Sequence, residues 1–214
     1  MYKKKPFFIV FEGVEGCGKS FQSKKLLNNL KKKRIPALLT REPGGTKSAE
    51  LIRNLILKDY FNHDSKEKFD KYTDTLLYLA ARNEHIKNKI DPALKKKSVV
   101  ICDRFTDSTL AYQVYGKNVN INFINNIHKF ILGKIKPNLT FVLKVSTETS
   151  KKRLKKRKTK NRYDNFAQNF YSRAQNSFLK IAKNKKNYFV LNSSKNDSNL
   201  EKKIFKIVSA YLKI

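Results

Sequence analysis

Five short apolar runs divide this chain, and in each run the apolar residues are continuous instead of alternating with polar ones. The runs cover residues 7–11, 37–40, 99–102, 139–145 and 188–191. Continuous runs of this length are typical of strands that are buried on both faces of a parallel sheet. The pattern therefore predicts a sheet built from five buried strands.

The segments between the runs repeat apolar residues every three to four positions, as helices do. They predict helices over residues 19–33, 46–58, 67–95, 107–133, 147–157, 163–183 and 197–212. Strands that alternate with helices predict an α/β fold, in which helices flank a parallel sheet to give three layers. Because no repeat and no linker rich in Pro, Gly or Ser interrupts the pattern, we expect residues 1–214 to form a single domain.

Length and composition narrow the class of protein. A chain of 214 residues, 40% of them hydrophobic, is long enough for one substantial core. No segment approaches the roughly 20 consecutive apolar residues of a membrane helix, so we expect no membrane partner. Cys17 and Cys102 are too few for a disulfide framework or a metal cluster, which indicates a cytoplasmic location. The basic and apolar start of the chain is a weaker match to a signal peptide, because it lacks a small-residue cleavage site.

The formal net charge of +31 admits two interpretations. One is that the chain binds a polyanion, such as nucleic acid or an anionic membrane. The other is a general bias toward lysine, since lysines occur all along the chain, from Lys3 to Lys213, and not in one stripe. We favour the compositional interpretation and do not expect specific nucleic-acid binding.

One glycine-rich segment lies between a predicted strand and a predicted helix. Its residues, Gly13-Val14-Glu15-Gly16-Cys17-Gly18-Lys19-Ser20, match the pattern G-x-x-x-x-G-K-[ST]. Glycines allow the backbone to wrap around phosphate oxygens, which the N–H groups of the loop and of the helix start then face. Lys19 is expected to reach the β- and γ-phosphates, and the Ser20 hydroxyl to ligate Mg²⁺. The segment predicts a nucleoside triphosphate site.

Charged residues follow two more of the predicted strands. Arg41 lies in "TREPGGT", residues 40–46, and Asp103 and Arg104 follow the third apolar run. In parallel sheets, ligands bind at the edge where the carboxyl ends of the strands meet. Asp103 suits a Mg²⁺ ion there, and the two arginines suit a second phosphate group. Two opposed phosphate sites predict transfer between phosphates and not simple hydrolysis.

The predicted helix 67–95 carries a largely apolar stripe, which consists of Tyr72, Leu76, Leu79, Ala80, Asn83, Ile86 and Ile90. Tyr78 and Arg82 lie together off the centre of that stripe. An aromatic ring beside a guanidinium can stack on a base and donate to a base carbonyl. The alternative is a cation–aromatic pair on the flank of the helix, with no role in binding.

Four segments, in this order, resemble the thymidylate kinase family over nearly the whole chain: "FEGVEGCGKS", "TREPGGT", "LLYLAAR" and "DRFTDSTLAYQ". The resemblance implies a P-loop fold with a five-stranded parallel sheet. It also implies a reaction that converts dTMP to dTDP with ATP and Mg²⁺, and a homodimer.

The resemblance assigns the phosphates and the metal to particular residues. Residues 13–20 hold ATP, and Glu15 lies near the deoxyribose 3′-hydroxyl and the metal. Arg41 and Arg104 hold the dTMP phosphate, while Asp103 joins Ser20 at the Mg²⁺ ion. Lys19, Asp103 and Arg104 are thus expected to take part in catalysis.

The resemblance also assigns residues to thymine and to the sugar. Tyr78 stacks on thymine, and Arg82 donates to its O4 atom. Ser108 and Thr109 reach the base, and Tyr112 lines the sugar and disfavours a 2′-hydroxyl. Cytosine would present an amino donor to Arg82 and leave a buried donor unpaired, a mismatch that discriminates strongly.

The basic segment "KKRLKKRKTKNRY", residues 151–163, becomes a candidate lid. In one bacterial branch of the family, the catalytic arginine comes from the lid and Gly occupies the loop position of Gly16. By this resemblance we expect Arg157 and Arg162 to close over the γ-phosphate and neutralise transition-state charge. For Arg153 and most of the lysines, a solvated basic face is the favoured interpretation.

Two other functions compete with this one. A deoxynucleoside kinase would need no paired arginines for a phosphate and would accept thymidine itself. A nucleic-acid-binding protein with a vestigial nucleotide site would bind DNA tightly and lose that binding in salt. The sequence contains no recognisable DNA-binding module.

Overall fold

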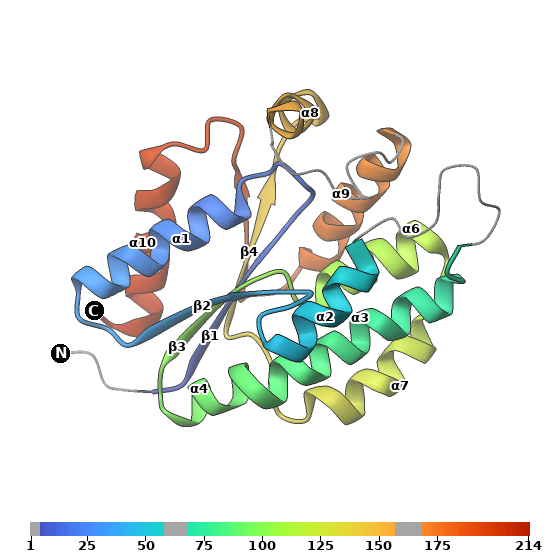
Figure 1. The fold of residues 1–214 in the computed structure, drawn as a ribbon. Coiled ribbons are helices and arrows are strands. Elements are labelled where there is room, and N and C mark those ends of the chain that lie inside the picture. The colour runs from blue at the N-terminus through green and yellow to red at the C-terminus, as the bar shows by residue number, and fades with distance from the viewer. Residues whose placement is uncertain (1–4, 58–67, 157–167) are drawn as a thin grey trace.

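The computed structural model describes residues 5–57, 68–156 and 168–214, and its centre is a five-stranded parallel sheet (Figure 1). The strands are β1 (Phe7–Glu12), β2 (Ala37–Arg41), β3 (Val99–Asp103), β4 (Leu139–Lys144) and β5 (Tyr188–Asn192). Their order in the sheet is β2-β3-β1-β4-β5, and every neighbouring pair is parallel. The predicted α/β fold and its strands are confirmed.

Helices cover both faces of this sheet. They are α1 (Lys19–Lys32), α2 (Lys47–Leu57), α3 (Lys71–His85), α4 (Asp91–Lys95), α5 (Thr106–Thr109), α6 (Tyr115–Lys117), α7 (Ile121–Leu132), α8 (Thr147–Lys155), α9 (Gln168–Ala182) and α10 (Ser198–Leu212). Two π-helical stretches, η1 (Ile86–Ile90) and η2 (Leu110–Val114), join α3 to α4 and α5 to α6. In Figure 1, α1 and α10 lie on one side of the sheet, and α3, α4 and α7 lie on the other. None of the described helices has the length and apolarity needed to cross a bilayer.

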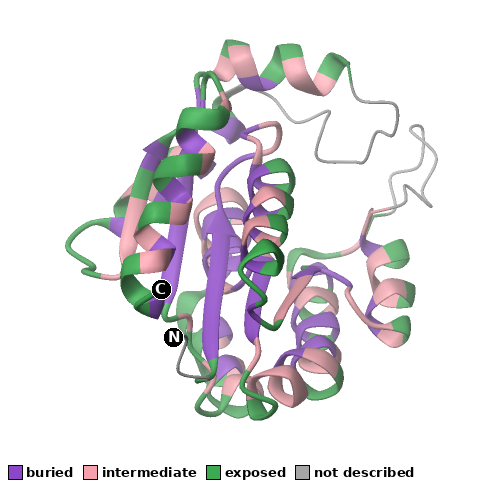
Figure 2. Ribbon diagram, turned by 90° about the vertical axis from the view of Figure 1, so that its left-hand side faces the viewer, coloured by how far each residue is buried: buried purple, intermediate pink, exposed green. Residues whose placement is uncertain are grey.

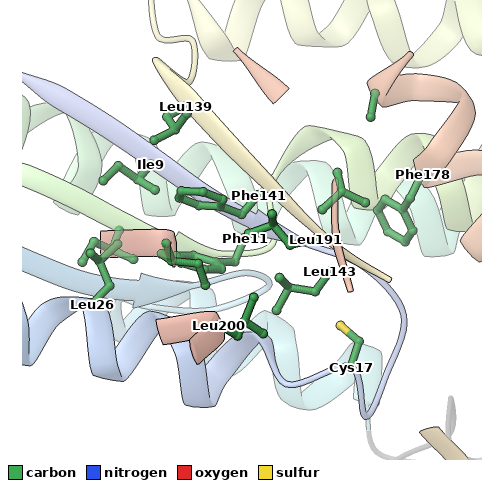
Figure 3. Close-up of a cluster of buried hydrophobic side chains, with 14 of the residues drawn as sticks. Ile9, Phe11, Cys17, Leu26, Leu139, Phe141, Leu143, Phe178, Leu191 and Leu200 are labelled. Carbon is green, nitrogen blue, oxygen red and sulfur yellow. The ribbon is translucent and has the colours of Figure 1, made fainter. Parts of the chain in front are cut away.

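The core follows from the side-chain alternation of β1, which is buried along its whole length (Figure 2). Ile9 and Phe11 belong to the larger apolar cluster, with Leu26 of α1 and Leu200 of α10 (Figure 3). Phe8 points to the opposite face, into a second cluster with η1. β1 is therefore the rigid centre from which the glycine-rich loop emerges.

The expectation of five strands buried on both faces is correct only for the three central ones. β1, β3 and β4 are buried almost throughout, whereas β2 and β5 are half-buried. β2 and β5 occupy the two edges of the sheet, where each strand has a neighbouring strand on one side only. An apolar run of four residues does not reveal whether its strand is central or at an edge.

The predicted helix 107–133 is wrong in its continuity. Asn118 adopts a left-handed backbone conformation, with φ 54°, and ends the first helical segment. Asn120 then caps α7, because its side chain accepts a hydrogen bond from the backbone N–H of Asn122 at 2.8 Å. Asparagine tolerates both roles better than most residues, so the break follows from the two asparagines.

The buried face of α3 also differs from the predicted stripe. Leu76 is 47% exposed and Ala80 is exposed, whereas Thr75, Leu79 and Arg82 are buried. The helix is therefore rotated relative to the prediction, and Arg82 lies within its buried face instead of off to one side. The polar residues on this face are buried because remote segments supply their hydrogen-bond partners.

Candidate active site

A cavity of about 650 Å³ lies where the loops after β1, β2 and β3 meet. Its lining includes most of the predicted site residues: Glu15, Gly16, Gly18, Lys19, Ser20, Arg41, Tyr78, Arg82, Asp103, Arg104, Ser108, Thr109 and Tyr112. Gly13, Val14 and Cys17 belong to the same loop but lie outside the lining. Arg157 and Arg162 lie outside the described residues. The parallel sheet thus brings together side chains that are far apart in the sequence.

The loop between β1 and α1, residues 13–20, has a backbone that depends on its glycines. Gly13, Gly16 and Gly18 have φ values of 135°, 70° and 96°. A Cβ atom on Gly13 would lie 2.6 Å from the Leu143 carbonyl oxygen, and one on Gly16 would lie 2.8 Å from the Ser150 carbonyl oxygen. Glycine is required here both for its conformation and for close backbone approach.

Lys19 opens α1 and is almost fully buried beneath this loop. Its Nζ atom donates to the carbonyl oxygens of Gly13 at 2.9 Å and of Val14 at 2.8 Å. α1 starts at Gly18 without a side-chain cap, and its first turn contains no acidic residue. The helix start therefore presents N–H groups and a positive dipole end that suit an anion.

Ser20 and Asp103 place two side-chain oxygen groups side by side at the cavity wall. The Ser20 hydroxyl donates to the Asp103 carboxylate, and both residues line the cavity beside Lys19. Hard divalent cations such as Mg²⁺ prefer hydroxyl and carboxylate oxygens, together with water and phosphate. The chemistry of this pair fits a Mg²⁺ ion.

Arg104 stands at the junction of the loop and the acceptor side of the cavity. Its backbone is left-handed, with φ 72°, and its Nη1 atom donates to the Gly13 carbonyl at 2.9 Å and to the Ser108 hydroxyl at 3.1 Å. Nη2 donates to Glu15 at 2.8 Å. The other Glu15 oxygen accepts from the Tyr112 hydroxyl at 2.6 Å. Five predicted site residues, Gly13, Glu15, Arg104, Ser108 and Tyr112, are thus joined in one network.

Arg53 is a further cavity residue, and the sequence did not reveal it. It lines the cavity from α2, and its Nη1 atom donates to the Pro43 carbonyl at 2.6 Å. Burial and the positive charges of Arg41 and Arg104 lower its pKa, against the opposing effect of Glu50. A cation placed among other cations and desolvated is costly unless an anion binds there. In the sequence, the available signal for Arg53 was a cation among the apolar residues of the predicted helix 46–58.

Arg41 contributes to the same positively charged wall but is more exposed. Its Nη2 atom lies 3.2 Å from a Glu50 carboxylate oxygen, and its side chain is 55% exposed. Glu50 also accepts a hydrogen bond from the Gly45 backbone N–H at 2.8 Å. Glu50 therefore holds the loop after β2 and the Arg41 side chain together at the cavity entrance.

Arg82 is 3% exposed and nearly saturated with hydrogen bonds. Nε donates to Glu42 at 2.7 Å, and Nη1 lies 2.9 Å from the Thr109 hydroxyl and 2.8 Å from His128 Nε2. Nη2 donates to the Phe105 carbonyl at 2.9 Å. Because a guanidinium has five N–H groups, these contacts of the described residues leave one Nη2 N–H for a ligand.

The partners of Arg82 come from remote segments, which is why the sequence did not reveal them. Burial tends to raise the pKa of Glu42, but Arg82 and His85 reverse that effect and lower it, so Glu42 is a carboxylate. Burial and Arg82 lower the pKa of His128 to about 3, so its imidazole is neutral and accepts from Arg82. The guanidinium is held in one orientation by one charged and several neutral acceptors.

Gln113 adds a second polar group at this end of the cavity. Its Nε2 atom is buried and has no hydrogen-bond partner among the described residues, although the residue lines the cavity. A buried amide without a partner is costly, and a ligand carbonyl would relieve that cost. Tyr78 lines the same cavity with its aromatic ring. Ligand groups that accept hydrogen bonds and stack therefore suit this end.

Arg153 of α8 does not lie on a solvated face, and that interpretation was wrong. Its Nη1 atom donates to the Gly16 carbonyl at 3.1 Å, and Nη2 donates to the Ser194 carbonyl at 2.6 Å. The residue therefore connects α8 to the glycine-rich loop and to the loop after β5.

Fold and site together define a class: an α/β nucleotide kinase whose phosphate loop faces a second cationic site across one cavity. Comparison with known proteins makes this specific. A family model described as "Thymidylate kinase" matches residues 11–204, and the chain belongs to the thymidylate kinase family. The predicted family resemblance is therefore confirmed.

Individual relatives agree with the family model. A thymidylate kinase of Wolbachia pipientis wMel is 41% identical, over 82% of this chain and 84% of its own length. One of Mycoplasma capricolum is 36% identical, over 96% of both chains. The crystal structure of thymidylate kinase from Ehrlichia chaffeensis superposes with a TM-score of 0.74 at 28% identity, and covers 95% of this chain and 99% of that one.

Proposed function

We propose that this chain transfers the γ-phosphoryl group of ATP to the 5′-phosphate of dTMP, which yields dTDP and ADP. The observation that carries the proposal is one cavity that is lined both by a glycine-rich loop suited to an anion and by three arginines. Those arginines are Arg41, Arg53 and Arg104. Membership of the thymidylate kinase family supports the nucleotide, and the phosphate loop supports a triphosphate donor.

On the donor side, residues 13–20 hold the phosphates of ATP. Backbone N–H groups of the loop and of the α1 start donate to phosphate oxygens, and Lys19 Nζ leaves its two carbonyl partners for the β- and γ-phosphates. Ser20 and Asp103 would hold Mg²⁺, which would neutralise part of the negative charge of the phosphates. No protein nucleophile is required, because positioning and charge neutralisation carry this type of reaction.

On the acceptor side, Arg104 and Arg53 bind the dTMP phosphate, and Arg41 adds charge at the cavity entrance. These cations repel one another, and a doubly charged phosphate offsets that repulsion by pairing with them. Glu15, which Arg104 and Tyr112 hold in place, is proposed to lie near the deoxyribose 3′-hydroxyl of bound dTMP. The acceptor phosphate is thereby directed toward the phosphate loop.

At the far end, the base is recognised by stacking and by hydrogen bonds. Tyr78 stacks on thymine, and the remaining Nη2 N–H of Arg82 donates to the O4 atom. The unpaired Nε2 of Gln113 donates to a second thymine carbonyl. Ser108 and Thr109 act mainly through the arginines that they contact.

The lid and the single-domain organisation also belong to this proposal. Residues 151–163 act as a lid, from which Arg157 and Arg162 approach the γ-phosphate. The attachment of Arg153 to Gly16 supports a lid that starts beside the phosphate loop. Residues 1–214 then work as one domain, since the described elements share one sheet.

A substrate panel tests the reaction itself. ADP release is measured with Mg·ATP and each of dTMP, dUMP, dCMP and dGMP. We expect dTMP to give the highest kcat/KM, with dCMP lower by about 100-fold or more because its 4-amino group opposes the Arg82 donor. A preference for dCMP or dGMP would overturn the assignment of Arg82 and Gln113.

The two competing functions give different results in simple assays. A deoxynucleoside kinase would phosphorylate thymidine at a rate similar to its best substrate. A nucleic-acid-binding protein would retain salt-sensitive DNA binding and release no ADP when dTMP is added. We expect turnover with dTMP and not with thymidine, because three arginines at the acceptor end suit a phosphate.

We further propose that two copies form a homodimer in the cytoplasm. Large apolar side chains are exposed on the neighbouring helices α2 and α3, where Leu51 is 69% exposed and Leu55 and Leu76 also face solvent. Burying such a face against a second copy is favourable. Cys17 and Cys102 are both free thiols, which supports a reducing compartment.

A further inference from the structure

Glu12, the last residue of β1, is a buried carboxylate that the reaction as described does not use. It is 0% exposed and does not line the cavity. One oxygen accepts from the backbone N–H of Phe105 at 2.8 Å and of Ser108 at 3.2 Å. The other accepts from the Ser108 hydroxyl at 2.6 Å. Glu12 thus caps α5, whose own N-cap residue, Phe105, has no side-chain oxygen.

This cap fixes the turn that carries Arg104. Arg104 precedes Phe105 and has the left-handed φ of 72°, which costs energy for a residue with a Cβ atom. The Ser108 hydroxyl donates its proton to Glu12 and accepts from Arg104 Nη1 at 3.1 Å. Because a hydroxyl has a single proton, the acceptor on Glu12 determines which way Ser108 faces.

We propose that Glu12 is a positioning residue, which orients Arg104 toward the acceptor phosphate through Ser108 only while its carboxyl group is ionised. Protonated Glu12 donates to Ser108 and no longer accepts its proton, so the Ser108 hydroxyl loses the acceptor that fixes its orientation beside Arg104. It also removes a negative charge next to Arg104. The inference rests on the proposed role of Arg104 as a ligand of the dTMP phosphate.

The surroundings of Glu12 place its titration in an accessible range of pH. Burial raises the pKa of Glu12 to about 7, and so does the charge of Asp107. Ser108, Arg104 and the Phe105 N–H act in the opposite direction. Tyr188 of β5 and Cys102 of β3 are the other titratable groups that sense its charge, and burial raises the pKa of both, so they stay neutral.

The experiment compares pH profiles of kcat/KM for dTMP in the wild type and in Glu12→Gln, from pH 6 to pH 8.5. The amide mimics protonated Glu12 at every pH. With a pKa of about 7, the ionised fraction falls from about nine-tenths at pH 8 to about one-tenth at pH 6. We therefore expect the wild-type advantage over Glu12→Gln to shrink by up to about tenfold between these pH values.

The substrate phosphate also titrates, with a second pKa of about 6, but it does so equally for both enzymes. The ratio of the two profiles therefore isolates Glu12. The change should appear in the KM for dTMP, while the KM for ATP stays within about twofold. Parallel profiles, or an equal rise in both KM values, would overturn the proposal.

A second variant keeps the test decisive if Glu12→Gln folds poorly. Ser108→Ala leaves the carboxylate and its backbone contacts in place but removes the hydroxyl between Glu12 and Arg104. We expect the Glu12-dependent part of the pH profile to disappear in this variant. If this part persists in Ser108→Ala, the connection through Ser108 is refuted. If Arg104→Lys binds dTMP as tightly as the wild type, the role of Arg104 is refuted instead.

Discussion

At the scale of single residues, the site depends on buried charges whose partners are fixed by the fold. Arg82 and Glu42 form an ion pair at 2.7 Å with both side chains almost fully buried. Glu12 is as deeply buried but has no ion pair among the contacts of the described residues; it accepts only N–H and O–H donors. The pKa of Glu42 is lowered and that of Glu12 is raised. The two carboxylates therefore contribute with opposite sign to the pH dependence of the free energy of unfolding.

The raised pKa of Glu12 predicts a pH dependence of stability. The folded state binds a proton at about pH 7, while an unfolded Glu binds it at about pH 4.5. Protonation of Glu12 therefore favours the folded state, and the free energy of unfolding falls as pH rises from about 4.5 to about 7. The fall amounts to about 3 kcal/mol, from roughly 1.4 kcal/mol for each pH unit.

Urea denaturation of the wild type and of Glu12→Gln at pH 5 and pH 8 measures this term. Glu12→Gln has no such titration, so the wild type should lose about 2–3 kcal/mol more than the variant between the two pH values. Groups that do not interact with Glu12 contribute equally to both proteins and cancel. A difference below about 0.5 kcal/mol would show that Glu12 titrates normally in the folded state.

At the scale of elements, two side chains attach α8 to the glycine-rich loop: the Ser150 hydroxyl donates to the Glu15 carbonyl at 2.7 Å, and Arg153 makes the second connection. Arg153 joins the Gly16 carbonyl to the Ser194 carbonyl, so it fixes α8 relative to the loop that is proposed to bind ATP. Hydrogen bonds from a charged donor contribute about 1.5–3 kcal/mol each. The placement of α8 therefore affects the donor nucleotide more than the acceptor.

Arg153→Ala is expected to raise the KM for ATP by about tenfold and to leave the KM for dTMP within about twofold. The matched control is Lys152→Ala, which removes an exposed cation from the neighbouring position of the same helix. Steady-state kinetics with each substrate varied in turn gives both constants. Equal effects of the two substitutions would mean that only general positive charge matters.

The elements were predictable where local signals dominate. Continuous apolar runs identified the strands, and the glycine-rich pattern identified the loop between β1 and α1. Helix continuity from 107 to 133 was predicted wrongly, because apolar periodicity continues across Asn118 while the backbone does not. Periodicity reports which side chains can be buried together and contains no information on a left-handed residue.

The residues that were not predicted escaped notice for a different reason. Glu12, Arg53 and Gln113 lie within apolar stretches or beside motif residues, and each acquires its role from segments distant in the sequence. The rotated face of α3 has the same origin, since Arg82 is buried only because Glu42 and His128 meet it. Such partners become visible only when the sheet order is known.

At the scale of the whole molecule, the exposed apolar face of α2 and α3 bears on assembly. Leu51 and Leu55 on α2 and Leu76 on α3 are exposed, while the opposite sides of these helices meet the rest of the fold. Large exposed apolar patches are uncommon on monomers and usually mark an interface. This face is therefore the proposed contact between two copies.

Leu76→Glu should convert a dimer of about twice the 25.0 kDa chain into a monomer, because a charge would be buried at the contact. Light scattering after gel filtration measures the mass. Val190→Glu is the matched control, since Val190 is a similarly exposed apolar residue on the edge strand β5. A dimer that survives Leu76→Glu unchanged would place the contact elsewhere. A monomeric wild type would contradict the proposed homodimer.

The measurement closest to the central claim is calorimetric titration of dTMP and of thymidine into the wild type and into Arg104→Ala. If the arginines hold the acceptor phosphate, dTMP should bind the wild type at least about 100-fold more tightly than thymidine. Arg104→Ala should remove most of that advantage and leave thymidine affinity within about threefold. Equal affinities for dTMP and thymidine in the wild type would contradict the account.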